Sequence, residues 1–362
     1  MSDPAILPTG GNRPLRRPDE LVGAGLVPPE RLAELEQVAA RYAVAITPAM
    51  ADLVDAGDAN DPIARQFVPD GRELDHRPEE LADPIGDHSH SPVKGIVHRY
   101  PDRVLLKPSH ACPVYCRFCF RREMVGPGGE ALDPAEFAQA IGYIADHPEI
   151  WEVVITGGDP LMLSPRRLQE LVAALDAIPH VAVIRFHSRV PVVDPGRIDA
   201  QLVAALATDK ALWIAVHANH ARELGAPQAA ACRRLSQAGI PLLGQTVLLK
   251  GVNDDVASLT ELFRRLVALR IKPYYLHHGD LAPGTAQFRT SIDEGQALMR
   301  ALRGAVSGLC QPTYVLDIPG GHGKAPIGPG FIEAQGPGRW LVTDFRGQTH
   351  LYPPPESAKD NL

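Results

Sequence analysis

Three closely spaced cysteines are the residues of this chain best suited to unusual chemistry. Cys112, Cys116 and Cys119 lie in the segment HACPVYCRFCFRRE with the spacing C-x3-C-x2-C. Thiolates are the usual ligands of iron–sulfur clusters, and three of them can hold three irons of a 4Fe-4S cube while the fourth iron keeps an open position. The alternative is a structural zinc site, but zinc usually takes four protein ligands, and the chain has no partner C-x2-C pair. The spacing therefore favours a cluster that can bind a small molecule directly.

A lysine near the end of the chain is the second candidate. Lys324 closes the segment YVLDIPGGHGK, which begins as a strand-like run and continues into glycines. A lysine amine can form a Schiff base with pyridoxal phosphate, and neighbouring glycine amides can bind a phosphate group. The same letters also describe a flexible turn with a surface lysine, so the segment taken alone leaves both interpretations open.

The elements that must position these residues alternate regularly from Arg103 onward. Short apolar, β-branched runs alternate with longer amphipathic stretches, and Asp133-Pro134 and Ser164-Pro165 are typical helix starts. This alternation predicts βαβ units and a parallel sheet. Six units would make a partial (β/α)6 barrel of the α/β class, with the residues after each strand facing one mouth. The expected strands are 104–106, 153–156, 181–186, 212–216, 242–248 and 273–276, and the expected helices are 133–147, 164–177, 197–207, 222–238 and 255–269, followed by a helix at 291–303 and a strand at 314–316.

Two parts flank this predicted core of residues 96–320. Residues 1–95 contain a helix-like stretch from Pro29 to Val44 and then an Asp-, Pro- and His-rich segment, DPIGDHSHSP, without a strand pattern. They predict a helical N-terminal extension with a long irregular connection. Residues 321–362 hold the Lys324 loop and the tail WLVTDFRGQTHLY, which predicts a short β-hairpin turning at Arg346-Gly347.

The composition excludes several classes of protein. A net charge of -7 at pH 7 provides no basic field for nucleic acid. No apolar run is long enough to span a bilayer, and the first residues show no apolar signal core, so we expect a cytoplasmic protein that binds no membrane. Five cysteines in a chain of 362 residues do not make a disulfide framework. Cys232 and Cys310 stand alone and are expected to be small buried side chains.

The cysteine motif resembles that of the radical S-adenosylmethionine superfamily. Its C-x3-C-x2-C spacing, with an aromatic residue, Phe118, before the last cysteine, is typical of that superfamily. The resemblance implies that the open iron binds S-adenosylmethionine, which is cleaved to a radical. Gly157, Gly158 and Asp159, in TGGDP after the second strand, are similar to the element that holds the methionine amino group. A GGDP turn alone would be a weak signal.

The combination with Lys324 resembles the lysine 2,3-aminomutase family from about His98 to Pro353. The phrases that carry the resemblance, in order, are HRYPDRVLL, CRFCFRRE, TGGDPLML, SRVPVVDPGRI, LLGQTVLLKGVND, RIKPYYLHHGDL, FRTSIDEG and DIPGGHGK. It implies that Lys324 carries pyridoxal phosphate, that Arg99 and Arg103 meet its phosphate, and that Arg121 takes the substrate α-carboxylate. His217 and Gln245 match positions that seat S-adenosylmethionine.

The resemblance also bears on the substrate. Asp280, in HHGDL, and Asp317, in VLDIPGG, match the two positions that face the side-chain ammonium of lysine, which favours L-lysine as substrate and β-lysine as product. The alternatives are another amino acid such as glutamate or arginine, a radical enzyme without pyridoxal phosphate, and a metal-binding module without catalysis. His277 and His322 depart from the family pattern, and the chain lacks a cysteine-rich zinc-binding tail, which puts a zinc-linked tetramer in doubt. The resemblance further implies an electron donor such as flavodoxin or ferredoxin, and it leaves a homo-oligomer open.

Overall fold

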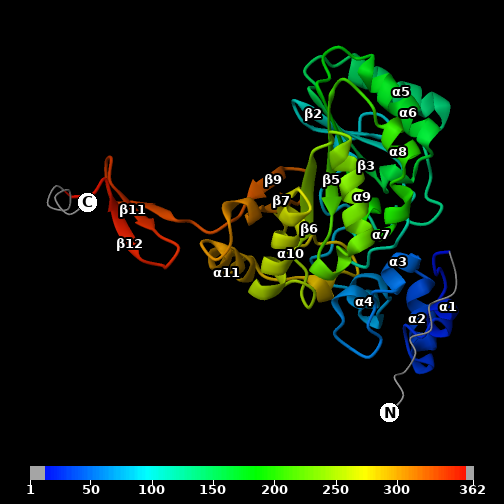
Figure 1. Ribbon diagram of the computed structural model, residues 1–362, viewed down its shortest axis with the longest axis horizontal. Helices are drawn as coiled ribbons and strands as arrows, with labels where there is room; N and C mark the ends of the chain where they lie inside the picture. Colours follow the sequence, from blue (N-terminus) through cyan, green and yellow to red (C-terminus); the bar gives the residue numbers. More distant parts are fainter. Residues whose placement is uncertain (1–12, 356–362) are drawn as a thin grey trace.

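The computed structural model describes residues 13–355, so residues 1–12, where the sequence shows no signal core, and residues 356–362 lie outside the described part. A nine-stranded sheet in the order β1 to β9 forms the core. Strands β2 to β8 are parallel to one another and curve into a nearly closed barrel (Figure 1). The prediction of a partial α/β barrel is confirmed. The parallel strands are β2 (Arg103–Ser109), β3 (Glu152–Gly157), β4 (Val183–Ser188), β5 (Ala211–His217), β6 (Leu242–Val247), β7 (Ile271–His277) and β8 (Thr313–Ile318).

The two edges of the sheet carry antiparallel strands that the sequence did not predict. β1 (Ile96–Tyr100) pairs with β2, and β9 (Gly323–Pro326) pairs with β8. The Tyr100 hydroxyl accepts a hydrogen bond from the backbone N–H of Lys324 at 2.7 Å. This bond joins the first and last strands of the sheet and fixes Lys324 at the closure of the barrel.

Helices cover the outside of the barrel, as the alternating pattern predicts. Each strand buries mostly apolar residues, and helices such as α10 bury one apolar side, which includes Leu259, Phe263 and Leu266. Asp133 and Ser164 cap helices whose first residue is proline, which confirms those predicted helix starts. The helices are α5 (Pro134–Ala145), α6 (Pro165–Asp176), α7 (Val190–Val193), α8 (Ala200–Ala205), α9 (Ala226–Gln237), α10 (Val256–Ala268) and α11 (Ile292–Leu302).

Short helices make up most of the part before β1. They are α1 (Pro18–Gly23), α2 (Leu32–Ala39), α3 (Pro48–Ala51) and α4 (Pro62–Phe67). The predicted helix from Pro29 to Val44 is too long, because the regular α-helix ends at Ala39 after a 3-10 turn at Pro29–Arg31. Beyond it, Tyr42 packs against Tyr115 of the cysteine loop, and Ile46 forms a bridge with Leu15. These long-range contacts favour an extended chain there.

A small antiparallel sheet follows β9 and lies at one end of the longest axis of the molecule (Figure 1). It contains β10 (Ile332–Ala334), β11 (Trp340–Thr343) and β12 (Thr349–Tyr352). The predicted hairpin turn around Arg346-Gly347 is confirmed, with Thr343 paired to Thr349, whereas β10 was not expected. Within residues 13–355, no helix is both long and apolar enough to cross a membrane. Cys232 and Cys310 are both buried, as expected.

Candidate active site

A cavity of about 470 Å³ extends through the barrel to the carboxyl ends of the parallel strands. This volume lies in the range of small-molecule sites, roughly 300 to 1,000 Å³. It is lined by residues from distant parts of the chain, and they include every site residue predicted from the sequence. These are Arg99, Arg103, Cys112, Cys116, Cys119, Arg121, Gly157, Gly158, Asp159, His217, Gln245, Asp280, Asp317 and Lys324.

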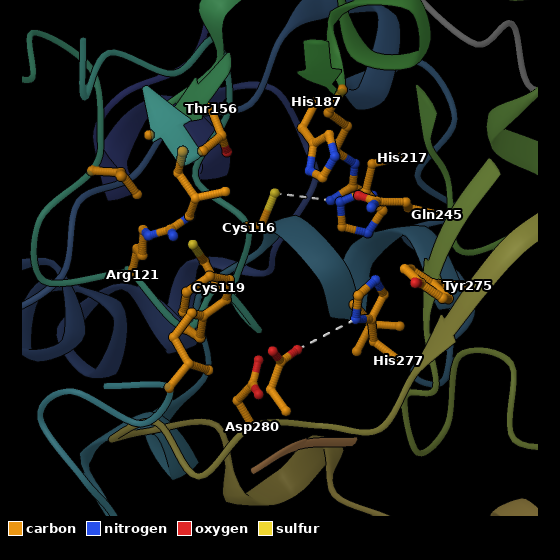
Figure 2. Close-up of a pocket in the computed structure, with 18 of the residues that line it drawn as sticks. Cys116, Cys119, Arg121, Thr156, His187, His217, Gln245, Tyr275, His277 and Asp280 are labelled. Carbon is orange, nitrogen blue, oxygen red and sulfur yellow. Dashed lines mark hydrogen bonds and ion pairs between the residues drawn. The ribbon is translucent and has the colours of Figure 1, made fainter. Parts of the chain in front are cut away.

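The three cysteines lie on the loop after β2. Figure 2 shows Cys116 and Cys119 with their sulfur atoms directed into the cavity beside Arg121. Burial raises the pKa of all three thiols, that of Cys119 to about 11, so thiolates here need added positive charge, which iron ions supply. No group of three or more His, Cys, Asp or Glu side chains within residues 13–355 is placed to hold a single metal ion. The zinc alternative would need such a group.

A buried ion-pair cluster, whose residues do not line the cavity, supports the cysteine loop. Glu73, 1% exposed, accepts hydrogen bonds from Arg117 and Arg122, which are 0% and 2% exposed. Arg122 also donates to the carbonyl oxygen of Gly284 at 2.6 Å, and Arg117 to that of Ala43 at 2.7 Å. Buried charges are costly unless paired and hydrogen-bonded. These contacts therefore fix the loop against the N-terminal part.

Arg189, directly after β4, contacts a cysteine of the motif. Its Nη1 donates to the sulfur of Cys116 at 2.9 Å, and its Nη2 donates to Gln66 at 2.6 Å and to Glu223 at 2.7 Å. Burial raises the pKa of Cys116, but the Arg189 charge opposes that rise. Arg189 thus favours the thiolate that a metal cluster requires.

The glycine turn after β3 packs tightly on the cysteine loop. A Cβ atom on Gly157, whose φ is +110°, would lie 2.6 Å from the carbonyl oxygen of Ser109, and one on Gly158 would lie 2.4 Å from that of Ala111. Only glycine permits this approach. The Asp159 carboxylate accepts hydrogen bonds from Ser188 Oγ at 2.7 Å and the Arg189 N–H at 2.6 Å. Its side chain is therefore used within the protein and sets the shape of the turn.

His217, the last residue of β5, is paired with Gln245, which lies within β6. Figure 2 shows the two side chains next to each other at the wall of the cavity. One ring nitrogen of His217, Nε2, lies 3.1 Å from Asn219 Oδ1. Burial holds the pKa of His217 well below its usual value. The imidazole is therefore neutral and available for hydrogen bonds.

Lys324 stands beside two carboxylates and a histidine. Its Nζ lies 2.6 Å from Asp317, and the other oxygen of Asp317 lies 3.7 Å from His277 Nδ1. Burial would raise the pKa of Asp317, but the nearby His277 and the Lys324 charge outweigh it and lower the pKa. Burial and the nearby Asp317 raise the pKa of Asp280 to about 7. Figure 2 shows Asp280 and His277 on the same side of the cavity. In the immediate surroundings of Lys324, two carboxylates therefore face one lysine cation.

The three predicted anion-binding arginines also line the cavity. Arg99 donates to the carbonyl oxygen of Ile85 at 2.7 Å, and both Arg99 and Arg121 bind the carboxylate of Asp87. Arg103 lies over the Tyr100 ring, 4.0 Å from its centroid. A cavity with thiols, a lysine, paired acids and several arginines can hold charged ligands and a metal cluster together.

Comparison with known proteins agrees with this arrangement. Residues 106–263 match the radical SAM superfamily, and residues 299–362 match the family described as lysine-2,3-aminomutase. The L-lysine 2,3-aminomutase of Clostridium subterminale is 40% identical over 312 residues, which cover 86% of this chain and 75% of that protein. The chain belongs to the lysine 2,3-aminomutase family.

Relatives in the lysine 2,3-aminomutase family are named for more than one amino acid. The glutamate 2,3-aminomutase of Clostridioides difficile is 35% identical over 314 residues, 87% of this chain and 74% of that protein. The L-lysine 2,3-aminomutase of Escherichia coli K12 is also 35% identical, over 86% of this chain and 91% of that protein. Substrate choice therefore has to be argued from the pocket.

Family membership makes the chain a radical SAM isomerase whose cofactors are a 4Fe-4S cluster, S-adenosylmethionine and pyridoxal phosphate. The described residues fit these groups. Three thiols face one cavity without converging on a single ion, and Lys324 offers an amine. His187 Nε2 and Arg99 Nε are buried without a hydrogen-bond partner within residues 13–355, as expected where ligands complete a site.

Four residues of this site were missed by the sequence analysis. Glu73 and Asp87 come from the part before β1, and His187 and Arg189 come from the end of β4. Arg189 could have been found, because it lies within a phrase shared with the family, SRVPVVDPGRI. The additional arginines of CRFCFRRE indicate that a buried acid such as Glu73 is needed as their partner. The segment DPIGDHSHSP, which contains Asp87, gave no such indication. The positions of its acids along the chain do not show which arginines they contact in the fold.

Proposed function

We propose that this chain interconverts L-lysine and β-lysine by moving the α-amino group to the neighbouring carbon. The observation that carries the proposal is the pair Asp280 and Asp317 beside Lys324. The proposal draws further support from the relatives named as L-lysine 2,3-aminomutases, three of which are 40–41% identical to the chain.

The charges of the pocket favour an ammonium group on the substrate side chain. Asp317 is close enough to Asp280 to raise the pKa of that carboxyl group, and Lys324 is the cation bonded to Asp317. We propose that Lys324 holds pyridoxal phosphate, so its amine no longer balances Asp317 in the working enzyme. A second cation is then needed, because buried charges require partners. A side-chain carboxylate, as in glutamate, would add repulsion.

The other predicted residues receive roles that fit their positions. Cys112, Cys116 and Cys119 hold the cluster, and the Gly157–Asp159 turn with His217 and Gln245 seats S-adenosylmethionine. Arg99 and Arg103 meet the phosphate, and Arg121 binds the α-carboxylate, for which a guanidinium is suited. When bound, the cluster and S-adenosylmethionine supply a radical that removes hydrogen, and pyridoxal phosphate supplies an aldehyde for the amino group. The barrel orients the substrate and excludes water and oxygen.

We further propose a division of labour along the chain. Residues 1–95 brace the site, residues 96–320 form the barrel core, and residues 321–362 provide the lysine loop and the terminal sheet. An electron donor such as flavodoxin or ferredoxin would serve a cytoplasmic enzyme of this kind. A homo-oligomer is a further proposal, supported by exposed apolar residues of the terminal sheet such as Ile332, Phe345 and Tyr352.

An anaerobic amino-acid panel tests the proposed substrate. Reconstituted protein with dithionite and S-adenosylmethionine is incubated separately with lysine, glutamate, arginine and norleucine, which has the lysine chain without its ammonium. We expect β-lysine from lysine and at least about tenfold lower turnover of norleucine. Asp280→Asn should reduce that preference, whereas Asp146→Asn, an exposed acid at the end of α5, should leave it unchanged.

Two results would reject the lysine assignment. One is efficient turnover of glutamate or arginine with no β-lysine. The other is an equal rate for lysine and norleucine, since the acid pair would then not recognise the ammonium. Conversion of S-adenosylmethionine without any visible absorbance from bound pyridoxal phosphate would favour a radical enzyme of another kind.

A further inference from the structure

One carboxylate bridges the two arginines assigned to different anions. Asp87 is 5% exposed and comes from the irregular segment before β1. Its Oδ1 accepts from Arg99 Nη2 at 3.1 Å, and its Oδ2 accepts from Arg121 Nη2 at 2.7 Å and Nε at 3.1 Å. Lys107 Nζ lies 3.7 Å from Oδ2. Arg99 and Arg121 line the cavity, and Asp87 stands behind them.

The charges around Asp87 do not balance. Three cations, Arg99, Arg121 and Lys107, face this one carboxylate, and all four side chains are about nine-tenths buried or more. Burial opposes ionisation of Asp87, but the charges of Arg121, Lys107 and Arg99 outweigh it and lower its pKa. Burial and Arg121 lower the pKa of Lys107, whereas Asp87 raises it. Asp83 also acts on Lys107, and the positive charge that remains is what bound anions would neutralise.

The segment that carries Asp87 is held by its own Asp83 and by close packing on the lysine loop. The Asp83 carboxylate accepts hydrogen bonds from the N–H groups of Asp87 at 2.9 Å and His88 at 2.8 Å. Gly86, with φ +68°, packs so closely on the lysine loop that a Cβ atom there would lie 2.3 Å from the backbone nitrogen of Gly321. The position of Asp87 is therefore set by the same loop that carries Lys324.

The contrast with Glu73 shows that Asp87 does more than stabilise a loop. Glu73 also binds two arginines, but neither Arg117 nor Arg122 lines the cavity, whereas Arg99 and Arg121 both do. Asp87 uses Nε and Nη2 of Arg121, so Nη1 is not engaged by it. Arg99 Nε and Arg122 Nε are both buried without a partner within residues 13–355, but of these two arginines Arg99 lines the cavity. The arginines at Asp87 retain capacity for ligands.

We propose that Asp87 is a positioning residue that fixes the separation between Arg99 and Arg121, so that the cofactor phosphate and the substrate α-carboxylate bind in one defined relative orientation. This inference rests on the roles of Arg99 and Arg121 under the proposed function. Removing the charge of Asp87 leaves the cations more attractive to anions but without a common anchor. The relative orientation of the cofactor phosphate and the substrate α-carboxylate should therefore be disturbed, while the affinity for these anions should not fall.

Three variants separate charge, geometry and folding. Asp87→Asn keeps the shape and removes the charge, and Asp87→Ser is a second neutral variant should the first not fold. Asp87→Glu keeps the charge, and Asp75→Asn is a matched control that changes an exposed acid of the part before β1 without touching the arginines. We expect Asp87→Asn to lower kcat between about tenfold and a hundredfold, since small misplacement of reacting groups has effects of that order. KM should not rise in proportion, and Asp87→Glu should recover most of the rate.

A measurement without turnover accompanies the kinetics. Pyridoxal phosphate is titrated into each protein, and visible absorbance and circular dichroism are recorded for the bound cofactor. We expect Asp87→Asn to bind it at least as tightly as the wild type at low salt, with weaker circular dichroism per bound cofactor, and Asp87→Glu to restore the signal. If the wild type turns over no amino acid, the proposed function fails, but this titration still decides the role of Asp87.

The proposal would be overturned by any of three results. A folded Asp87→Asn or Asp87→Ser protein with wild-type kcat and circular dichroism would show that the bridge is not needed. Loss of cofactor affinity in parallel with kcat would indicate a purely structural role. Equal effects of Asp87→Asn and Asp75→Asn would indicate that the loss of any acid from this part of the chain has the effect, and that the bridging carboxylate has no role of its own.

Discussion

The surroundings of the cysteine loop and those of Lys324 contain similar residue types but differ in how their buried acids are paired with cations. Behind the cysteines, Glu73 pairs with Arg117 and Arg122, and Glu223 pairs with Arg189. Around Lys324, Asp280 has its pKa raised to about 7 by burial and by Asp317. In the first set each acid has a guanidinium partner, whereas in the second two acids share one lysine.

The difference teaches how to separate scaffold from site in this molecule. A buried acid with guanidinium partners and no cavity surface holds the backbone in place. A buried acid with a raised pKa that lines a cavity is a candidate for ligand binding. Asp87 falls between the two, since it is paired like the scaffold but its partners line the cavity.

The largest expected effect comes from removing one thiol. Cys119→Ser should abolish the 4Fe-4S cluster and all turnover, because each of the three thiolates is needed to hold one of the three ligated irons. Iron and sulfide analysis and the electron paramagnetic resonance spectrum of the reduced protein check this. Pyridoxal phosphate should still bind at Lys324, as the two surroundings are built separately. Loss of both cofactors would contradict that separation.

Removing the lysine should have the opposite result, with pyridoxal phosphate lost and the cluster retained. Lys324→Ala should lower turnover by about a thousandfold or more, in the range seen when a covalent catalytic residue is lost, while iron and sulfide contents stay at wild-type values. Visible absorbance of bound pyridoxal phosphate should disappear. Lys250→Ala, on the loop after β6 and exposed, is the matched control and should change neither quantity.

Breaking the scaffold should affect stability. Glu73→Gln leaves Arg117 and Arg122 without their buried counter-charge, and loss of one partner of a buried pair typically lowers the free energy of unfolding by about 3–5 kcal/mol. Urea unfolding followed by circular dichroism measures this change. Glu20→Gln, in the first turn of α1, is the comparison and should have a small effect. A stable Glu73→Gln protein would remove the distinction between scaffold and site.

The smallest predicted effect is a pH dependence of lysine binding. Asp280 ionises near pH 7, so KM for lysine should fall as the pH rises, and be roughly tenfold lower at pH 8 than at pH 6. Asp280→Asn should flatten the profile. The folded state keeps this proton longer than the unfolded state, so the contribution of Asp280 to stability, present at low pH, is lost as the pH rises through about 7. Equal KM values at both pH values would show that Asp280 is not the ammonium partner.

Much of the fold and site could be predicted because the signals are local. The alternation of strands and helices, the proline helix starts and the C-x3-C-x2-C loop depend on neighbouring residues, and each was found where expected. The edge strands β1 and β9 were missed, since they are short and pair antiparallel across the ends of the barrel. The helix expected to reach Val44 ends at Ala39, because Tyr42 and Ile46 make contacts far along the chain.

The sequence by itself determined which chemical groups this protein has and which of them follow strands, because spacing and periodicity are properties of the chain. Only the tertiary structure decided what those groups meet: Asp317 beside Lys324, Arg189 on the sulfur of Cys116, and Asp87 between two arginines. Such pairings join segments tens of residues apart or more, and they arise from how the barrel closes and how the N-terminal part packs on it. Charge balance in a buried site is therefore set in space and leaves little trace in sequence spacing.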